Sequence, residues 1–254
     1  YFHHIFGLVV YQYQIITEML LWQLIWPGTR VWYNKCMLEL KSICKQFKAN
    51  QAVDKLDLRV GRGEVYALIG PNGSGKTTII KMIAGLLMPN SGQILVNGAD
   101  AQVDPVAVKG WVGYIPDEPT AWERMTGEEF LHLVGALYDV PVEQRDRKIP
   151  ELLDRFSLAG VEKEYFADYS RGNKQKFTIL AALLHSPKLL LIDEPIVGLD
   201  PVSAENAEKI FQEFAAAGGS VLMVTHTLHV AERIAHRIGL LDKGRLAQSG
   251  TISS

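Results

Sequence analysis

A glycine-rich run near residue 70 has the composition of a loop that holds phosphate groups. Residues 70–77 read GPNGSGKT, which matches the pattern G-x-x-x-x-G-K-[S/T], and a second threonine follows. Glycines let the backbone turn its N–H groups inward around an anion, and the N-terminus of a following helix adds partial positive charge. Lys76 would bind the β- and γ-phosphates, and the Thr77 hydroxyl would ligate Mg²⁺. The residues expected to bind the phosphate chain are Asn72, Gly73, Ser74, Gly75, Lys76, Thr77 and Thr78.

An apolar run that ends in two carboxylates supplies the acid that such a loop needs. Residues 189–194 read LLLIDE, the pattern of a buried strand with Asp193 and Glu194 at its carboxyl end. Asp193 is expected to hold Mg²⁺ through water, and Glu194 to orient or deprotonate the attacking water. The two motifs together predict a nucleoside triphosphatase, but they leave GTPases, helicases, kinases and many ATPases open.

The elements that must position these motifs alternate along the chain. Strands are expected over 38–47, 52–60, 64–69, 93–96, 189–192 and 220–224, and helices over 76–86, 126–138, 151–156, 170–184, 203–217 and 228–238. Pro141 and Pro150 are expected to break the helical pattern, and residues 239–248 to form a hairpin.

This order of elements predicts an α/β fold. Alternating strands and helices require a parallel sheet flanked by helices, here of the P-loop NTPase type. The early strands and the closing hairpin predict an antiparallel β subdomain beside that sheet. The helical middle, at about 118–185, is predicted to be an inserted α-helical subdomain.

Four further segments, in order along the chain, produce a resemblance to a known family. Residues 169–175, YSRGNKQ, resemble the signature sequence LSGGQ of ATP-binding-cassette (ABC) proteins. Residues 113–118 (GYIPDE) resemble the Q-loop of that family, 198–200 the D-loop, and His226 the switch histidine. Over residues 38 to about 250 the chain resembles the ATP-binding subunits of ABC transporters, in particular the ABC-2-type exporters.

The resemblance implies a function, cofactors and partners. It implies a Mg²⁺-dependent ATPase on the cytoplasmic face of the cell membrane, with ATP and Mg²⁺ bound, that powers a separate transmembrane permease. It also implies a second ABC ATPase subunit, whose γ-phosphate is met by this chain's signature residues in a head-to-tail dimer. The signature residues expected to act in this way are Ser170, Arg171, Gly172 and Asn173.

The resemblance also assigns roles outside the two phosphate motifs. It implies that Phe47 stacks on adenine, that His226 contacts the γ-phosphate, and that Asp200 belongs to the D-loop. Asp117 replaces the usual glutamine of the Q-loop, so its contact with the metal would be ionic. Arg171 replaces the first glycine of the signature, which puts the rate of hydrolysis and the nucleotide-induced pairing in doubt.

Composition argues against a nucleic-acid-binding function. The chain has 254 residues, a net charge of −2 and no block of Lys and Arg, which argues against nucleic acid as a partner. Two rivals stay open: a catalytically weak regulatory ABC subunit, and a non-transport ABC ATPase.

The first residues differ from the rest in character. Residues 1–36 are apolar and precede Met37 and the ABC-like region, 37–254. They are interpreted as a leader of doubtful status, from upstream translation or of non-native origin. A membrane anchor or an additional packed element are the alternatives.

Overall fold

The computed structural model describes residues 36–119, 123–194, 196 and 198–252. The predictions on the N-terminal leader therefore fall, apart from Cys36, outside the described residues. Within the described part, no helix combines the length and the apolar character that crossing a bilayer would require.

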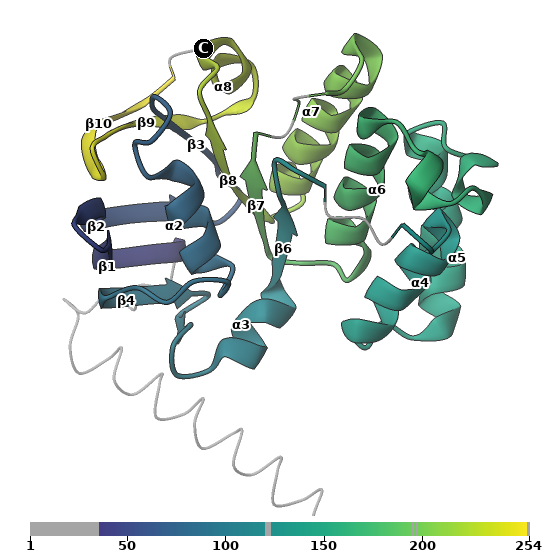
Figure 1. Cartoon of the computed structure of the whole chain (residues 1–254), viewed down its shortest axis with the longest axis horizontal. Coiled ribbons are helices and arrows are strands. Elements are labelled where there is room, and N and C mark those ends of the chain that lie inside the picture. Colours follow the sequence, from purple (N-terminus) through teal and green to yellow (C-terminus); the bar gives the residue numbers. More distant parts are fainter. Residues whose placement is uncertain (1–35, 120–122, 195, 197, 253–254) are drawn as a thin grey trace, which may run out of the picture. The chain divides into compact units, whose positions relative to one another are not determined.

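A six-stranded sheet forms the centre of the described chain, in the order β10-β9-β3-β8-β7-β6 (Figure 1). Its strands from β9 to β6 pair in parallel, and β10 is antiparallel to β9. Their bounds are β3 Val65–Ile69, β6 Val112–Ile115, β7 Leu189–Asp193, β8 Ser220–Thr225, β9 Arg237–Asp242 and β10 Arg245–Thr251.

A second, four-stranded sheet is antiparallel and has the order β2-β1-β4-β5. The strand β2 alternates between buried and exposed residues from Leu56 to Val60, as expected of a sheet with one covered face, whereas register shifts interrupt the alternation in β1. The bounds are β1 Cys36–Phe47, β2 Asn50–Gly61, β4 Ser91–Val96 and β5 Ala99–Asp100.

Helices cover both faces of the six-stranded sheet, and in Figure 1 α4, α5, α6 and α7 lie to one side of β7. The helices are α2 Lys76–Ile83, α3 Pro105–Trp111, α4 Gly127–Leu137, α5 Val142–Arg155, α6 Arg171–Leu184, α7 Pro201–Ala216 and α8 Leu228–Ile234, with 3₁₀ turns η1 Val161–Lys163 and η2 Phe166–Asp168. The predicted α/β fold, with a parallel sheet, an antiparallel sheet and a helical middle, is confirmed.

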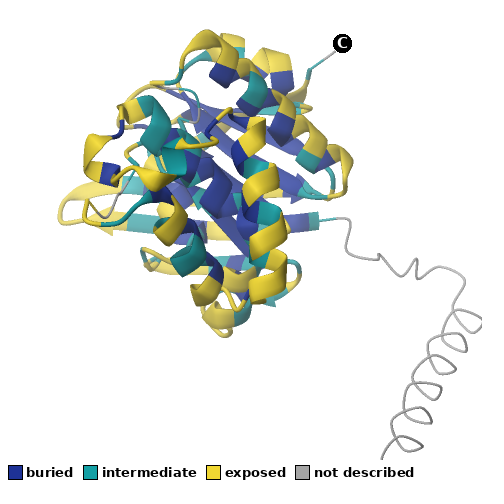
Figure 2. Ribbon diagram, turned by 90° about the vertical axis from the view of Figure 1, so that its right-hand side faces the viewer, coloured by how far each residue is buried: buried dark blue, intermediate teal, exposed yellow. Residues whose placement is uncertain are grey.

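Two apolar cores lie on the two faces of the six-stranded sheet. Alternate residues of β7 divide between them: Leu190 and Ile192 join the core under α6 and α7, and Leu189 and Leu191 join the core under α2 and the four-stranded sheet. All four side chains are fully buried, which is why this strand reads as a continuous apolar run (Figure 2). The strand can therefore hold the carboxylates at its end firmly.

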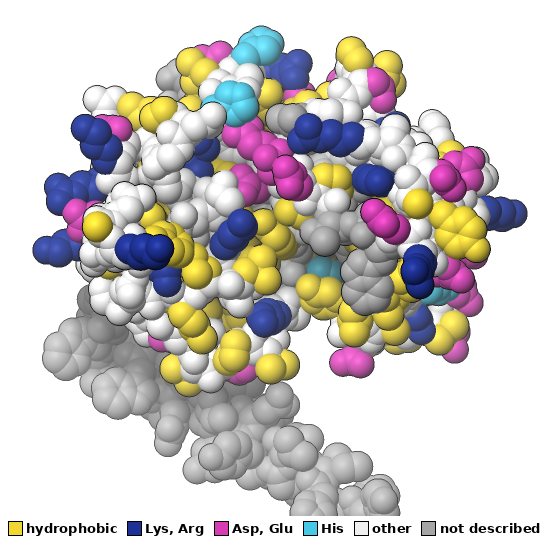
Figure 3. All heavy atoms as spheres, in the orientation of Figure 1, with side chains coloured by type: hydrophobic (Ala, Val, Ile, Leu, Met, Phe, Trp, Pro, Cys, Tyr) yellow, Lys and Arg dark blue, Asp and Glu magenta, His cyan; other side chains and the backbone are white. Residues whose placement is uncertain are grey.

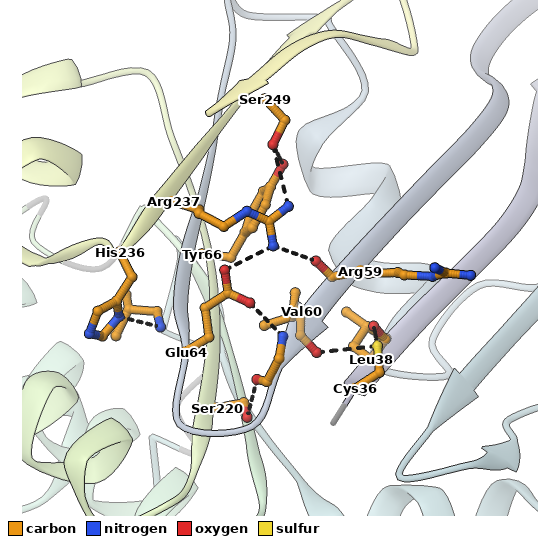
Figure 4. Close-up of polar contacts among 12 residues, drawn as sticks. Cys36, Leu38, Arg59, Val60, Glu64, Tyr66, Ser220, His236, Arg237 and Ser249 are labelled. Carbon is orange, nitrogen blue, oxygen red and sulfur yellow. Dashed lines mark hydrogen bonds and ion pairs between the residues drawn. The ribbon is translucent and has the colours of Figure 1, made fainter. Parts of the chain in front are cut away.

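The closing hairpin is fixed to the six-stranded sheet by a polar network (Figure 4). Arg237 lies 4.9 Å from the centre of the Tyr66 ring, and its Nη1 donates to Glu64 Oε1 at 3.0 Å. The hydroxyls of Tyr66 and Ser249 are 3.0 Å apart. These contacts join β10, β9 and β3, so the prediction that the hairpin belongs to the antiparallel subdomain is wrong.

Several predicted boundaries also differ from the structure. The helix α5 continues through Pro150, where a break was predicted, because Ile149 and Leu153 are buried on its inner face. The last helix, α8, ends at Ile234 rather than 238, because the chain turns there into β9, which pairs with β3. Neither α3 nor β6 was predicted.

Candidate nucleotide-binding site

The loop at 70–77 lies where β3 ends and α2 begins, at the carboxyl edge of the parallel sheet. Gly73 and Gly75 have φ values of 79° and 107°, a region that disfavours any residue with a Cβ. Gly75 is also closed in by the chain, because an added Cβ would lie 2.4 Å from the Ala52 carbonyl oxygen. The two glycines thus allow the loop to turn tightly into the helix.

Lys76 is 7% exposed, at the first position of α2. Its Nζ donates to the carbonyl oxygens of Gly70 at 2.6 Å and Pro71 at 3.1 Å. Ser74 Oγ is buried in the same loop and has no hydrogen-bond partner among the described residues. The buried ammonium group of Lys76 and the unpaired hydroxyl of Ser74 are groups to which a phosphate chain can hydrogen-bond.

Asp193 lies at the end of β7, opposite the start of α2, and is 2% exposed. Thr77 Oγ1 donates to Asp193 Oδ1 at 3.3 Å. Burial raises the pKa of Asp193, and the neighbouring carboxylates of Asp117 and Glu194 raise it further. A bound cation would relieve this unfavourable charge.

The donor set at this point fits Mg²⁺. A threonine hydroxyl and carboxylates are the hard oxygen ligands that this ion prefers. The described residues contain no cluster of three or more His, Cys, Asp or Glu that would cage a metal by itself. Mg²⁺ usually keeps several waters and is held by one or two carboxylates together with substrate phosphates, so the residues present fit it.

Glu194 is held firmly from the neighbouring strand. His226 Nδ1 lies 2.7 Å from Glu194 Oε1, which also accepts from the His226 backbone N–H at 2.9 Å. Thr225 Oγ1 donates to Glu194 Oε2 at 2.9 Å. Glu194 has a φ of 51°, in a region where a residue with a Cβ is strained, and such strain is frequent at functional sites.

Lys76, Thr77, Asp193, Glu194 and His226 line one cavity of about 520 Å³. It lies within the size range of small-molecule sites. Figure 3 shows acidic side chains gathered on the face in view, with histidine side chains above them. The lining residues are Phe47, Asn50, Ala52, Asn72, Gly73, Gly75, Lys76, Thr77, Thr78, Asp117, Arg171, Asp193, Glu194 and His226.

Phe47 lies at the rim of this cavity, at the end of β1. Its side chain is 45% exposed, and Lys45 Nζ lies 5.2 Å from the centre of the ring. An exposed aromatic ring beside a phosphate site offers a face on which a base can stack.

Other predicted residues lie outside the cavity lining. Ser170 caps α6, and its Oγ accepts from the Asn173 N–H at 3.1 Å. Gly172 packs closely against the loop that follows β7, because an added Cβ would lie 3.0 Å from the Gly198 carbonyl oxygen. Asp200 caps α7; its hydrogen bonds with Ser203, aided by a nearby lysine, lower its pKa to about 2. The chain does not bring Ser170, Gly172 or Asn173 to the wall of its own cavity.

The order of these motifs and their geometry agree with what comparisons with known proteins show. A family model described as "ABC transporter" matches residues 53–197, more than half of the chain. The chain belongs to the ABC transporter family. Its fold is that of an ABC ATPase cassette.

Curated relatives of this ABC protein are ATP-binding proteins of transporters. An uncharacterized ABC transporter ATP-binding protein of Nostoc sp. is 36% identical over 211 residues, which are 81% of this chain and 62% of the relative. A daunorubicin resistance ATP-binding protein of Streptomyces coeruleorubidus is 34% identical over 207 residues, 82% of this chain and 66% of the relative. The chain thus spans slightly less than two thirds of the length of these relatives.

A solved structure described as the ATP-binding subunit of an ABC transporter superposes with a TM-score of 0.81 at 36% identity, covering 85% of this chain and 90% of the other. A dimeric cassette in a post-hydrolysis state, bound to ADP and phosphate, has a TM-score of 0.78 at 23% identity and covers 86% of this chain and all of the other. At 23% identity, the similarity to this dimeric cassette shows the fold alone.

Two features of the site in this ABC protein could not be expected from the motifs. Asn50 and Ala52, from β2, contribute to the cavity wall, although no phosphate motif includes them. Arg171 also lines the cavity of its own chain, although its place in the signature predicts a contact with another subunit. Pairing between distant segments places these residues, and their spacing along the chain carries no signal for it.

Proposed function

We propose that this chain is the Mg²⁺-dependent ATPase subunit that powers transport, in the direction of export, by a separate membrane permease. The observation that carries the proposal is the convergence on one cavity of a buried lysine, a hydroxyl–carboxylate pair and a glutamate held by a histidine. The family and the resistance proteins among the relatives support transport, and the burial of the key groups supports hydrolysis.

In this proposal each group has a separate task. Lys76 and the N–H groups of the loop bind the phosphate chain of ATP. Glu194 accepts the proton of the attacking water, because it lies just beyond the metal-facing Asp193 and keeps a fixed orientation. His226 positions Glu194 and contacts the γ-phosphate, and Phe47 stacks on the adenine.

Thr77, Asp193 and Asp117 are the residues that would hold Mg²⁺. When bound there, the ion neutralises charge that develops on the phosphate oxygens. The same three side chains line a second hollow, together with Tyr114 and Lys81, next to the main cavity.

The partners follow from what the chain leaves incomplete. Ser170 and Gly172 are not among the residues that line the chain's own cavity, so a second ABC ATPase subunit in head-to-tail orientation would receive them at the γ-phosphate of its bound ATP. ATP would close such a dimer and hydrolysis would release it. The permease would dock near residues 117–128, of which 120–122 lie outside the described residues, and the pair would lie at the cytoplasmic face of the membrane.

Purified protein assayed with ATP and Mg²⁺ tests the proposal. We expect turnover that disappears with EDTA, and a Lys76→Ala variant that loses nucleotide affinity because its positive charge is gone. The variant Lys209→Ala removes an exposed lysine of α7, which pairs with Glu205 away from both hollows, and serves as the control. Unchanged binding in Lys76→Ala would contradict the site. Nucleotide binding without turnover would favour the regulatory subunit, and normal turnover with no permease partner would favour the non-transport ATPase.

A further inference from the structure

Two residues that depart from the family pattern contact each other. Arg171 replaces a glycine of the signature and Asp117 replaces the glutamine of the Q-loop, and Arg171 Nη2 lies 3.5 Å from Asp117 Oδ1. The stem of Arg171 packs over the loop after β7, since a Cβ added to Gly198 would lie 3.1 Å from Arg171 Cδ. Two substitutions far apart in sequence thus form a single ion pair within one chain.

The pair belongs to a set of contacts that attaches the start of α6 to the ends of two strands. Gln175, one turn after Arg171 and fully buried, directs its Nε2 to the Pro116 carbonyl oxygen at 3.5 Å. Arg171 and Gln175 therefore contact two consecutive residues after β6. On the same turns of α6, Lys176 lies 3.5 Å from Asp200.

The position of the pair matters because of the charges around it. The cavity is lined by three carboxylates, those of Asp117, Asp193 and Glu194. Among the described lining residues the lysine and arginine side chains are those of Lys76 and Arg171. Lys76 points to backbone carbonyl groups, so Arg171 is the cation that faces Asp117 directly.

We infer that Arg171 is a positioning residue that acts in its own chain by holding Asp117 and setting the charge balance of the nucleotide site. With Arg171 paired, Asp117 is partly neutralised and is a poorer ligand for a divalent cation. The same guanidinium makes the cavity more favourable for the phosphate chain of ATP. This inference rests on the proposed function, because it takes the cavity as the site of nucleotide and metal.

A purely structural role predicts a different outcome. Both side chains are about half exposed, 54% for Arg171 and 46% for Asp117, and an exposed ion pair contributes little to stability. If the pair only fastened α6, its loss would weaken the binding of metal and nucleotide together. If it sets the charge of the site, its loss must shift the two affinities in opposite directions.

The experiment compares full-length wild-type protein with Arg171→Gln, Asp117→Asn, the double variant and Arg171→Lys. Mn²⁺ binding without nucleotide is measured by electron paramagnetic resonance, and ATP binding is measured in EDTA. Protein is kept at a concentration at which sedimentation shows single subunits. Arg155→Gln is the matched control, because Arg155 pairs with Glu213 away from the cavity.

We expect Arg171→Gln to bind Mn²⁺ more tightly and metal-free ATP more weakly, each by about tenfold or less, as is usual for partly exposed charges. Asp117→Asn should shift both affinities the other way. The double variant should return towards wild type, Arg171→Lys should stay close to it, and high salt should shrink every difference.

Shifts of the two affinities in the same direction, or no shift in Arg171→Gln, would overturn the inference. If Lys76→Ala still abolished ATP binding in that case, the proposed function would stand alone. If wild-type protein bound ATP no better than Lys76→Ala, the proposed function and this inference would fail together.

Discussion

The two ends of the proposed site are built in different ways. The phosphate end has its key groups buried: Lys76, at the start of α2, is 7% exposed, and Asp193, at the end of β7, is 2% exposed. The signature end, at the start of α6, is exposed at Ser170 and Arg171 and half-buried at Gly172. Lys76 and Asp193 line the chain's own cavity, whereas Ser170 and Gly172 do not.

This difference teaches how the work would be divided between subunits. Buried groups in fixed positions can stabilise charge without reorganising, which is what hydrolysis requires. Exposed donors at a helix N-terminus can instead be offered to an anion on another molecule. We therefore expect changes at the phosphate end to stop chemistry or binding within one chain, and changes at Ser170 and Gly172 to affect pairing.

The largest expected effect is that of Glu194→Gln. This change keeps the shape of the side chain but removes its ability to take a proton, so we expect turnover to fall by about 10²- to 10⁴-fold. Nucleotide affinity should be kept, because Glu194 lies beyond the phosphate loop. Steady-state hydrolysis and equilibrium ATP binding measure the two quantities.

Glu213→Gln is the control for this prediction, because Glu213 is an exposed glutamate that pairs with Arg155. It should hydrolyse ATP at the wild-type rate. Normal turnover in Glu194→Gln would remove that residue from its proposed role and would break the contrast between the two ends.

Ser170→Ala tests the signature end. The loss of its hydroxyl removes a donor to the partner's γ-phosphate, and a donor of this kind is worth about 10²- to 10³-fold in turnover when it acts on the transition state. We expect lower turnover and no nucleotide-induced pairing, with ATP affinity of the single subunit unchanged. Sedimentation of protein with ATP, in the Glu194→Gln background, measures pairing.

The control for Ser170→Ala must lose a helix cap elsewhere, because Ser170 also caps α6. Asp104→Ala is suitable, since Asp104 caps α3 by accepting from the Ala107 N–H at 3.2 Å. It should lose a similar small amount of stability and still pair. Pairing that persists in Ser170→Ala would show that the exposed end does not serve a second subunit.

Local patterns predicted most of the fold and the phosphate end. The residues of β7 are apolar on both faces, and Asp193 closes the strand as expected. Thr126 and Glu129 form a capping box, and α4 begins directly after Thr126, where the helix over 126–138 was predicted to start. Such features depend on neighbours a few residues apart, so sequence spacing is enough to reveal them.

Features decided by packing between distant segments were missed. Pro150 removes one backbone N–H from α5, but the burial of Ile149 and Leu153 offsets that cost and keeps the helix continuous. The pair of Arg171 with Asp117 depends on how α6 packs beside the end of β6. No spacing rule relates these two residues, and only the folded chain shows that they share a cavity.

A smaller effect is expected at the rim of the phosphate end. Phe47 is half exposed, so Phe47→Ala should remove base stacking, which is worth about 1–3 kcal/mol per base, with little loss of stability. ATP affinity should fall by about tenfold, whereas the affinity for inorganic triphosphate should not change. Phe47→Trp should keep the affinity. Val103→Ala is the control, because Val103 is an exposed apolar residue that does not line the cavity. Equal losses for ATP and triphosphate would mean that the ring does not contact the base.

The smallest expected effect concerns the stability of the helical middle, which carries the signature end, relative to that of the phosphate end. Thr126 Oγ1 accepts from the Glu129 N–H at 3.2 Å, and the Glu129 carboxylate accepts from the Thr126 N–H at 2.9 Å. Thr126→Ala breaks this capping box, which costs about 1 kcal/mol. Hydrogen exchange should become faster in α4 and in the start of α6, which packs against it, while the loop at 70–77 and β7 keep their protection. If exchange rose equally in β7, the helical middle and the phosphate end would open as one unit. The two regions would then not differ in local stability.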